Sequence, residues 1–212
     1  MTRIIFILIL AGIGYWLYSS LFTAKPGQSI PNQGRDHVAE TTKVDYNSNP
    51  PTSGPHSEQW EKAGVYDRVL SDLRLVHSLE HGYVIISYNC QGKQTLGPWP
   101  LARLASKQAL SLNVYAHETE ETHEEPVASD GAEPDVSDWK NNQNCQTIVA
   151  KLTEIASNLK VWKLIVVPRP NLDAAIALTA WTRIDKMNQF DEKIIVSFVK
   201  TWRDKGPEKT ME

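Results

Sequence analysis

Two histidines four residues apart, His77 and His81, are the residues of this chain best suited to chemistry. Glu80 stands beside the second histidine, and a third imidazole, His56, ends the proline-rich stretch PPTSGPH at residues 50–56. On a helix, residues four apart lie on one face about one turn apart, so His77 and His81 could share a metal ion. Prolines restrict the backbone and therefore present His56 at little ordering cost. The pattern predicts a metal site at His56, His77 and His81.

Three imidazoles suit Zn²⁺ or Cu²⁺ and leave one coordination position open. Glu80 would then hydrogen-bond and orient one imidazole, or act as a base on bound water. The three methionines are scattered along the chain, which does not indicate a methionine site for Cu⁺. A structural role is the competing interpretation, in which the same side chains hydrogen-bond the proline-rich loop to the body of the domain.

Residues 77–81 also match the HxxEH pattern of inverted zincins, in which two histidines hold zinc and the glutamate activates the bound water. That chemistry needs a long helix and a distant carboxylate ligand, whereas Gly82 and an alternating apolar run follow at once. A metal-dependent hydrolase with Glu80 as its catalytic residue therefore ranks third. Metal binding ranks first, and a non-catalytic interaction or assembly module with a structural His/Glu cluster ranks second. An enzyme is not the leading expectation.

The elements that would position these residues follow from hydrophobic periodicity. Residues 67–80 have apolar side chains near helical spacing, with Gly82 at the place of a C-terminal glycine; a loop leading into a strand is the alternative. Further strands are predicted at 83–88, 112–116, 162–167 and 174–181, and helices at 101–110, 145–159 and 191–202. The order strand-helix-strand-strand-helix in the C-terminal half predicts one α+β domain, a mixed sheet with packed helices. The second half of thioredoxin-like folds shares this order.

The N-terminus predicts the compartment. Residues 4–22 contain no charged side chain and, at about 1.5 Å per residue, nearly span a hydrocarbon core of about 30 Å. Trp16 and Tyr18 lie where an interfacial aromatic belt is expected. A cleaved signal peptide and a buried helix are the alternatives. We expect a single-pass transmembrane anchor behind a tail of residues 1–3, with the lipid bilayer as its partner. The N-terminus would be cytoplasmic and the domain extracytoplasmic, at the cell membrane.

The composition of residues 23–212 predicts how this part of the chain is divided. Residues 23–45 are polar and rich in turn residues, which predicts a flexible linker before a domain at 46–208 and a tail at 209–212. Residues 117–138 hold nine acidic and no basic side chains, which predicts an exposed, mobile insertion. The net charge is −3, so the rest of the chain is mildly basic. No nucleic-acid partner is expected, because no binding motif accompanies that charge.

The two cysteines, Cys90 and Cys145, fit an extracytoplasmic domain, because disulfides persist in oxidising compartments. A bridge between them would contribute roughly 4 kcal/mol in the chain-entropy treatment. Two free buried thiols are the alternative. There is no CxxC motif, so thioredoxin-type redox chemistry has no support from the sequence.

Five motifs together resemble a known family. They are YNSNPPTSGPH at 46–56, GVYD at 64–67, VHSLEHG at 76–82, ALTAW at 177–181 and GPE at 206–208. This pattern is similar to the family catalogued as domain of unknown function 3105 (DUF3105), over roughly residues 44–208. The resemblance implies a bacterial protein with a membrane anchor and an extracytoplasmic domain. It points to His56, His77, Glu80 and His81, makes residues 117–138 an insertion, and implies no reaction or partner protein.

Overall fold

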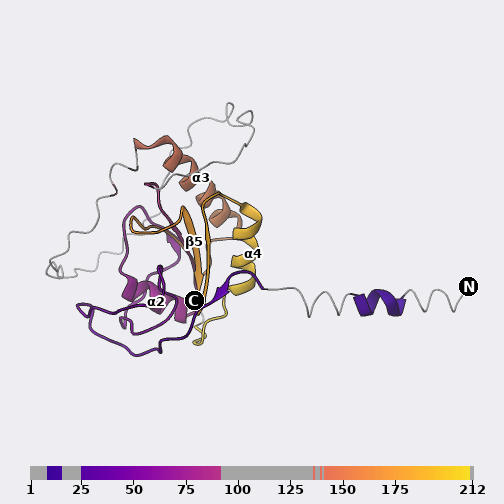
Figure 1. Cartoon of the computed structure of the whole chain (residues 1–212), viewed down its shortest axis with the longest axis horizontal. Coiled ribbons are helices and arrows are strands. Elements are labelled where there is room, and N and C mark those ends of the chain that lie inside the picture. The colour runs from indigo at the N-terminus through magenta and orange to yellow at the C-terminus, as the bar shows by residue number, and fades with distance from the viewer. Residues whose placement is uncertain (1–8, 16–24, 92–135, 137–138, 140, 211–212) are drawn as a thin grey trace, which may run out of the picture.

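A mixed six-stranded sheet, in the order β1-β6-β5-β3-β4-β2, separates α3 and α4 on one face from α2 on the other (Figure 1). The computed structural model describes residues 9–15, 25–91, 136, 139 and 141–210. The strands are β1 (Gln28–Ser29), β2 (Gly64–Val65), β3 (Val84–Tyr88), β4 (Leu164–Pro168), β5 (Ile176–Ala180) and β6 (Arg183–Met187). The helices are α2 (Asp72–Glu80), α3 (Gln143–Asn158) and α4 (Glu192–Trp202). This is the α+β class that the sequence predicted.

The centre of the sheet consists of β3, β4 and β5, which are buried along their whole length. β3 pairs in parallel with β4 and antiparallel with β5. Strands covered on both faces carry apolar side chains on both, which explains the nearly continuous runs VIISY, LIVVP and IALTA. Their bounds agree within two residues with the strands predicted at 83–88, 162–167 and 174–181.

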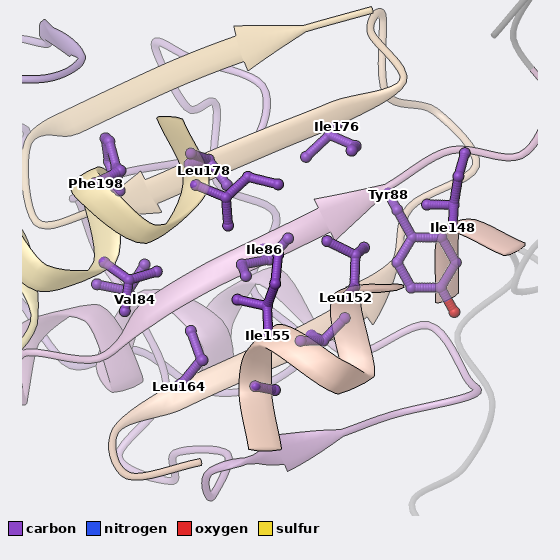
Figure 2. Packing of buried hydrophobic residues seen from close by; sticks show 14 of the residues in the cluster. Val84, Ile86, Tyr88, Ile148, Leu152, Ile155, Leu164, Ile176, Leu178 and Phe198 are labelled. Carbon is purple, nitrogen blue, oxygen red and sulfur yellow. The ribbon is translucent and has the colours of Figure 1, made fainter. Parts of the chain in front are cut away.

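The larger hydrophobic core lies between the sheet and helices α3 and α4 (Figure 2). Buried residues recur three or four apart on both helices and pack on the side chains of the central strands. Its main members are Val84, Ile86, Tyr88, Ile148, Leu152, Ile155, Leu164, Leu178, Ile195 and Phe198. Asn142 and Asp191 cap the two helices by accepting backbone N–H groups of the first turn. The helices predicted at 145–159 and 191–202 are thus confirmed.

α2 crosses the opposite face of the sheet and ends just before Gly82. Leu75 and Leu79 pack there in a smaller apolar cluster, which includes Ile85 of β3. Gly82 has a φ of 84°, a left-handed backbone conformation that favours glycine, and its N–H donates to the Leu79 carbonyl at 3.0 Å. The segment that contains the histidine pair is therefore a helix rather than a loop.

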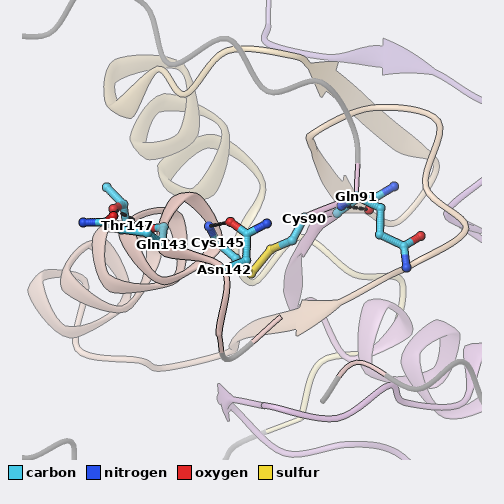
Figure 3. The surroundings of a disulfide bond; sticks show 7 residues. Cys90, Gln91, Asn142, Gln143, Cys145 and Thr147 are labelled. Atoms are coloured by element: carbon cyan, nitrogen blue, oxygen red, sulfur yellow. Dashed lines mark hydrogen bonds between the residues drawn. A yellow bond between two sulfur atoms is a disulfide. The ribbon is translucent and has the colours of Figure 1, made fainter. Parts of the chain in front are cut away.

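A disulfide joins Cys90, just after β3, to Cys145, in the first turn of α3 (Figure 3). The two Cα atoms are 5.2 Å apart. Asn142, the cap of α3, accepts the backbone N–H of Cys145 at 3.1 Å. The start of α3 is consequently fixed to the end of the central strand.

The C-terminal half contains one strand more than the sequence predicted. β6 follows β5 after a tight turn in which Thr182 has a φ of 57°. Its sequence RIDKM is mostly charged, because it lies toward one side of the sheet and only Ile184 is buried. Hydrophobic periodicity does not reveal such a strand, nor the two-residue strands β1 and β2.

Residues 25–45, expected to belong to a flexible linker, are bound to the domain along their length. β1 pairs with β6, and the Ile30 N–H donates to the Thr182 carbonyl at 3.0 Å. Further along, the Val38 N–H donates to the His56 carbonyl at 2.8 Å. Main-chain hydrogen bonds hold this segment, and they leave little trace in its composition. The domain therefore includes chain that its polar sequence assigned to the linker.

Several predicted segments lie outside the described residues. These are most of the anchor at 4–22, the helix at 101–110, the strand at 112–116, and the acidic segment 117–138 apart from residue 136. Residues 9–15 are helical and exposed. Within the described residues, no helix has both the length and the apolar character needed to cross a membrane.

Candidate metal centre

Four side chains from three segments converge beside the end of α2: His37, His56, His77 and Glu80. One nitrogen or oxygen atom of each lies within 4.8 Å of the corresponding atoms of the others. His56, His77 and Glu80 are buried, whereas His37 is exposed. This group of three imidazoles and one carboxylate has a composition that can hold a metal ion.

His56 is positioned by its own loop and by the segment that contains His37. The two residues form a parallel β-bridge, and the His56 N–H donates to the Asp36 carbonyl at 2.9 Å. Nδ1 of His56 lies 2.8 Å from the Gly54 carbonyl oxygen, which only accepts, so Nδ1 carries a proton. In the neutral ring, Nε2 therefore has a free lone pair, and it faces Oε2 of Glu80 at 2.9 Å.

His77, in the last turn of α2, has the same arrangement. Its Nδ1 donates to the Ser57 carbonyl at 2.7 Å, which leaves Nε2 as the lone-pair atom. Burial lowers the pKa of His77 more than this hydrogen bond raises it, and the imidazoles of His81, His56 and His37 lower the pKa further. The neutral ring, which is the form that binds metals, is thus favoured at this position.

Glu80 is the last residue of α2, and only 3% of it is exposed. One carboxylate oxygen faces His56, and the other lies 3.3 Å from the guanidinium of Arg35. A buried carboxylate is costly unless it is paired, and here its partners are an imidazole and an arginine that is half exposed. Glu80 is therefore placed to contact a bound ion itself, and not only to orient an imidazole.

His81 lies beside the four-residue group and contacts it through His77. The Nε2 atoms of the two histidines are 3.0 Å apart. Because Nε2 of His77 has the lone pair, Nε2 of His81 must carry the proton of this contact when no ion is bound. The indole of Trp60 covers both rings, with centroids 4.8 Å from His81 and 5.5 Å from His77.

The structure thus brings together all four residues that the sequence indicated, and adds His37. His56, His77 and Glu80 share the centre, while His81 stands at its side. His37 was assigned to a linker, and its only signal in the sequence was its residue type. Three imidazoles and a carboxylate favour Zn²⁺ or Cu²⁺ over hard cations such as Mg²⁺. Both cysteines are in the disulfide, so neither supplies a thiolate.

Comparison with known proteins identifies the family. The match to the family described as protein of unknown function (DUF3105) covers residues 37–129 and 136–212. It begins at His37, and its interruption falls inside the predicted acidic insertion. No curated protein and no solved structure matches the chain. The match covers most of the sequence and all four candidate metal ligands, and the chain therefore belongs to the DUF3105 family.

Proposed function

We propose that this protein binds one Zn²⁺ or Cu²⁺ ion through His37, His56, His77 and Glu80. The observation that supports this proposal is the hydrogen bonding of the two buried imidazoles. Both donate Nδ1–H to a backbone carbonyl, at 2.8 and 2.7 Å, and so leave Nε2 as the lone-pair atom, which faces Glu80 in His56 and His81 in His77. Histidines that bind metals characteristically donate their other ring N–H in this way, which fixes the tautomer and the ring orientation.

The contact between His56 and Glu80 favours metal binding over a purely structural cluster. A structural cluster pairs each acceptor with a donor. Here the Nε2 lone pair of His56 and a carboxylate oxygen are two acceptors 2.9 Å apart, so a proton or a metal ion has to lie between them. Two further candidate ligands, His37 and His77, each have an atom within 4.8 Å of the ligand atoms of His56 and Glu80, which makes a metal ion the better occupant. No observation specifically favours a hydrolase, because Glu80 is used as a ligand.

Elemental analysis of the purified full chain tests the proposal. After incubation with Zn²⁺ or Cu²⁺ and removal of free ions, we expect about one ion per chain, as for a closed four-ligand site. A His56→Ala/His77→Ala variant should lose the ion. His123→Ala, at a histidine of the acidic segment that is not one of the four proposed ligands, is the matched control and should keep it. A parent chain that stays free of both ions would contradict the proposal and leave an interaction or assembly module as the function.

We also propose that the protein is anchored in a membrane by residues 4–22, with the domain outside the cytoplasm. The uncharged N-terminal run and the disulfide support this location. The domain surface around Lys25 is suited to headgroups: the cationic groups of Lys25 and Arg183 lie over the indole of Trp202, at 5.5 and 4.8 Å from the ring centroid. Membrane fractionation followed by external protease should release the domain. Recovery of the chain in the soluble fraction would contradict the anchor.

A further inference from the structure

The C-terminal segment, which contains the GPE motif, is fixed to the end of α2. The Glu208 N–H donates to the Glu80 carbonyl at 3.1 Å, and the Asp204 N–H donates to the Gly82 carbonyl at 2.8 Å. A Cβ atom on Gly206 would lie 2.0 Å from the Glu80 carbonyl oxygen and 2.3 Å from the Gly82 nitrogen. Only glycine permits this approach, so the segment cannot shift along the helix end without losing its hydrogen bonds.

A buried lysine adds hydrogen bonds between the end of α2 and the C-terminal segment. Lys163 is 1% exposed, and its ammonium donates to the carbonyls of His81 and Thr210 and to the carboxylate of Asp204, at 3.0, 2.8 and 2.9 Å. A buried ammonium needs such partners, and three of them come from the helix end and the C-terminal segment together. The position of the residues between Asp204 and Thr210 is therefore well defined relative to the metal centre.

The contact between the C-terminal segment and the end of α2 brings the carboxylate of Glu208 close to His81, on the solvent side of the pair His77 and His81. Oε2 of Glu208 lies 3.9 Å from Nε2 of His81, which in turn lies 3.0 Å from Nε2 of His77. The side chain of Glu208 is 52% exposed and that of His81 is 5% exposed. Once an approaching ion displaces the proton on Nε2 of His81, ligand atoms lead from solvent to the buried centre, an oxygen first and nitrogens afterwards.

We infer that Glu208 and His81 form an outer subsite, which receives a divalent transition-metal ion from solvent and passes it to His77. This inference rests on the function proposed above. An exposed carboxylate attracts a hydrated cation, and a ligand within 4 Å on either side allows stepwise exchange of ligands without release of the ion. Glu208 would then affect how fast the ion enters and leaves, and would have little effect on how tightly the inner centre holds it.

Stopped-flow mixing of the full chain with Cu²⁺, followed by the visible absorption of the bound ion, tests this inference. In Glu208→Gln we expect the association and dissociation rate constants both to fall about tenfold, within the range by which local charge alters on-rates. The affinity and the stoichiometry should stay nearly unchanged. Glutamine keeps the backbone bond to Glu80, so the change isolates the carboxylate. Glu208→Asp should retain most of the rate, and Glu154→Gln, an exposed acid on α3, should match the parent.

Three results would contradict the outer subsite or the metal-binding function on which it rests. Parent rates in Glu208→Gln would overturn the outer subsite. Faster dissociation with unchanged association would make Glu208 a permanent ligand and would also overturn it. A parent chain that takes up no ion would instead remove the proposed function itself, and elemental analysis of the same preparation separates this result from the other two.

Discussion

The two faces of the sheet are built from the same strands but are used differently. The face under α3 and α4 is covered by two regular helices, and the described residues buried in its core are almost all apolar. The face under α2 is covered by a nine-residue helix and irregular chain, and it buries polar groups such as Thr52, His56 and Glu80. Apolar burial stabilises a fold, whereas buried polar groups are costly unless they are paired. The first face therefore gives the domain its stability, and the second gives it its site.

The largest effect is expected on the apolar face. Phe198 on α4 is fully buried, and Phe198→Ala should lower the free energy of unfolding by about 3–5 kcal/mol, because it leaves a cavity in the larger core. Denaturant unfolding followed by circular dichroism measures the change, and Phe198→Leu is the matched control with a smaller loss. A loss below about 1 kcal/mol would mean that this face is not the main source of stability.

The second-largest effect is expected from metal binding, which should stabilise the protein only through the site on the α2 face. If the centre binds Zn²⁺ or Cu²⁺, the ion at about 100 times its dissociation constant should raise the free energy of unfolding by about 2.7 kcal/mol. The same ion should leave the stability of His56→Ala unchanged, because this variant lacks one of the four proposed ligands. Thermal unfolding with and without the ion, and with a chelator added, provides the measurement. Equal shifts in parent and variant would place the ion elsewhere.

His37 allows metal binding to be tested separately from stability, because its side chain is exposed and is not part of a core. His37→Ala should weaken metal binding at least tenfold, which corresponds to about 1.4 kcal/mol. The stability of the metal-free protein should change by no more than about 0.5 kcal/mol, as for an ordinary surface substitution. Isothermal titration calorimetry gives the first value and chemical unfolding the second. Unchanged affinity would show that the centre consists of the three buried residues alone.

Thr179 tests whether the polar face is optimised for stability. Its hydroxyl is fully buried and, among the described residues, has no hydrogen-bond partner. Valine has nearly the same shape without the hydroxyl, so Thr179→Val should be neutral or should stabilise the domain by about 1 kcal/mol. Thr179→Ser, which keeps the hydroxyl and loses a methyl group, should destabilise it. A marked loss of stability in the valine variant would reveal a buried polar partner for Thr179.

The smallest effect is expected at a surface pair beside the site. The Arg74 guanidinium, which donates to both carboxylate oxygens of Glu40 at 2.7 and 2.9 Å, lowers the pKa of that carboxyl. A lowered carboxyl pKa contributes stability above the pKa of the unfolded chain, and this stability is lost as the pH falls through the folded pKa. Glu40→Gln should therefore cost less than about 1 kcal/mol at neutral pH, and nothing in acid. A constant difference at all pH values would contradict this electrostatic origin.

The sequence predicted the elements that bury apolar side chains at a regular period. The central strands and helices α2, α3 and α4 were found because Val84, Leu152 and Phe198 belong to such patterns. β1 and β6 were not found, because charged residues and backbone pairing define them. The same cause hid His37, since the chain around it is held by backbone hydrogen bonds, such as that from Val38 to His56. Within the site, residue types identified the candidate ligands, but only the geometry shows that Glu80 faces His56 directly.

The disulfide has a consequence for how this chain can change length. Cys90 follows the central strand β3 and Cys145 lies in the first turn of α3, and their Cα atoms are held 5.2 Å apart although 55 positions separate them. The cost of closing a loop grows only slowly with its length, and here a covalent bond already fixes both ends. Evolution can therefore lengthen or shorten the chain between these two cysteines without moving the strand or the helix. A protein engineer could use the same stretch of chain to insert a reporter or an affinity tag, since none of the candidate metal ligands belongs to it.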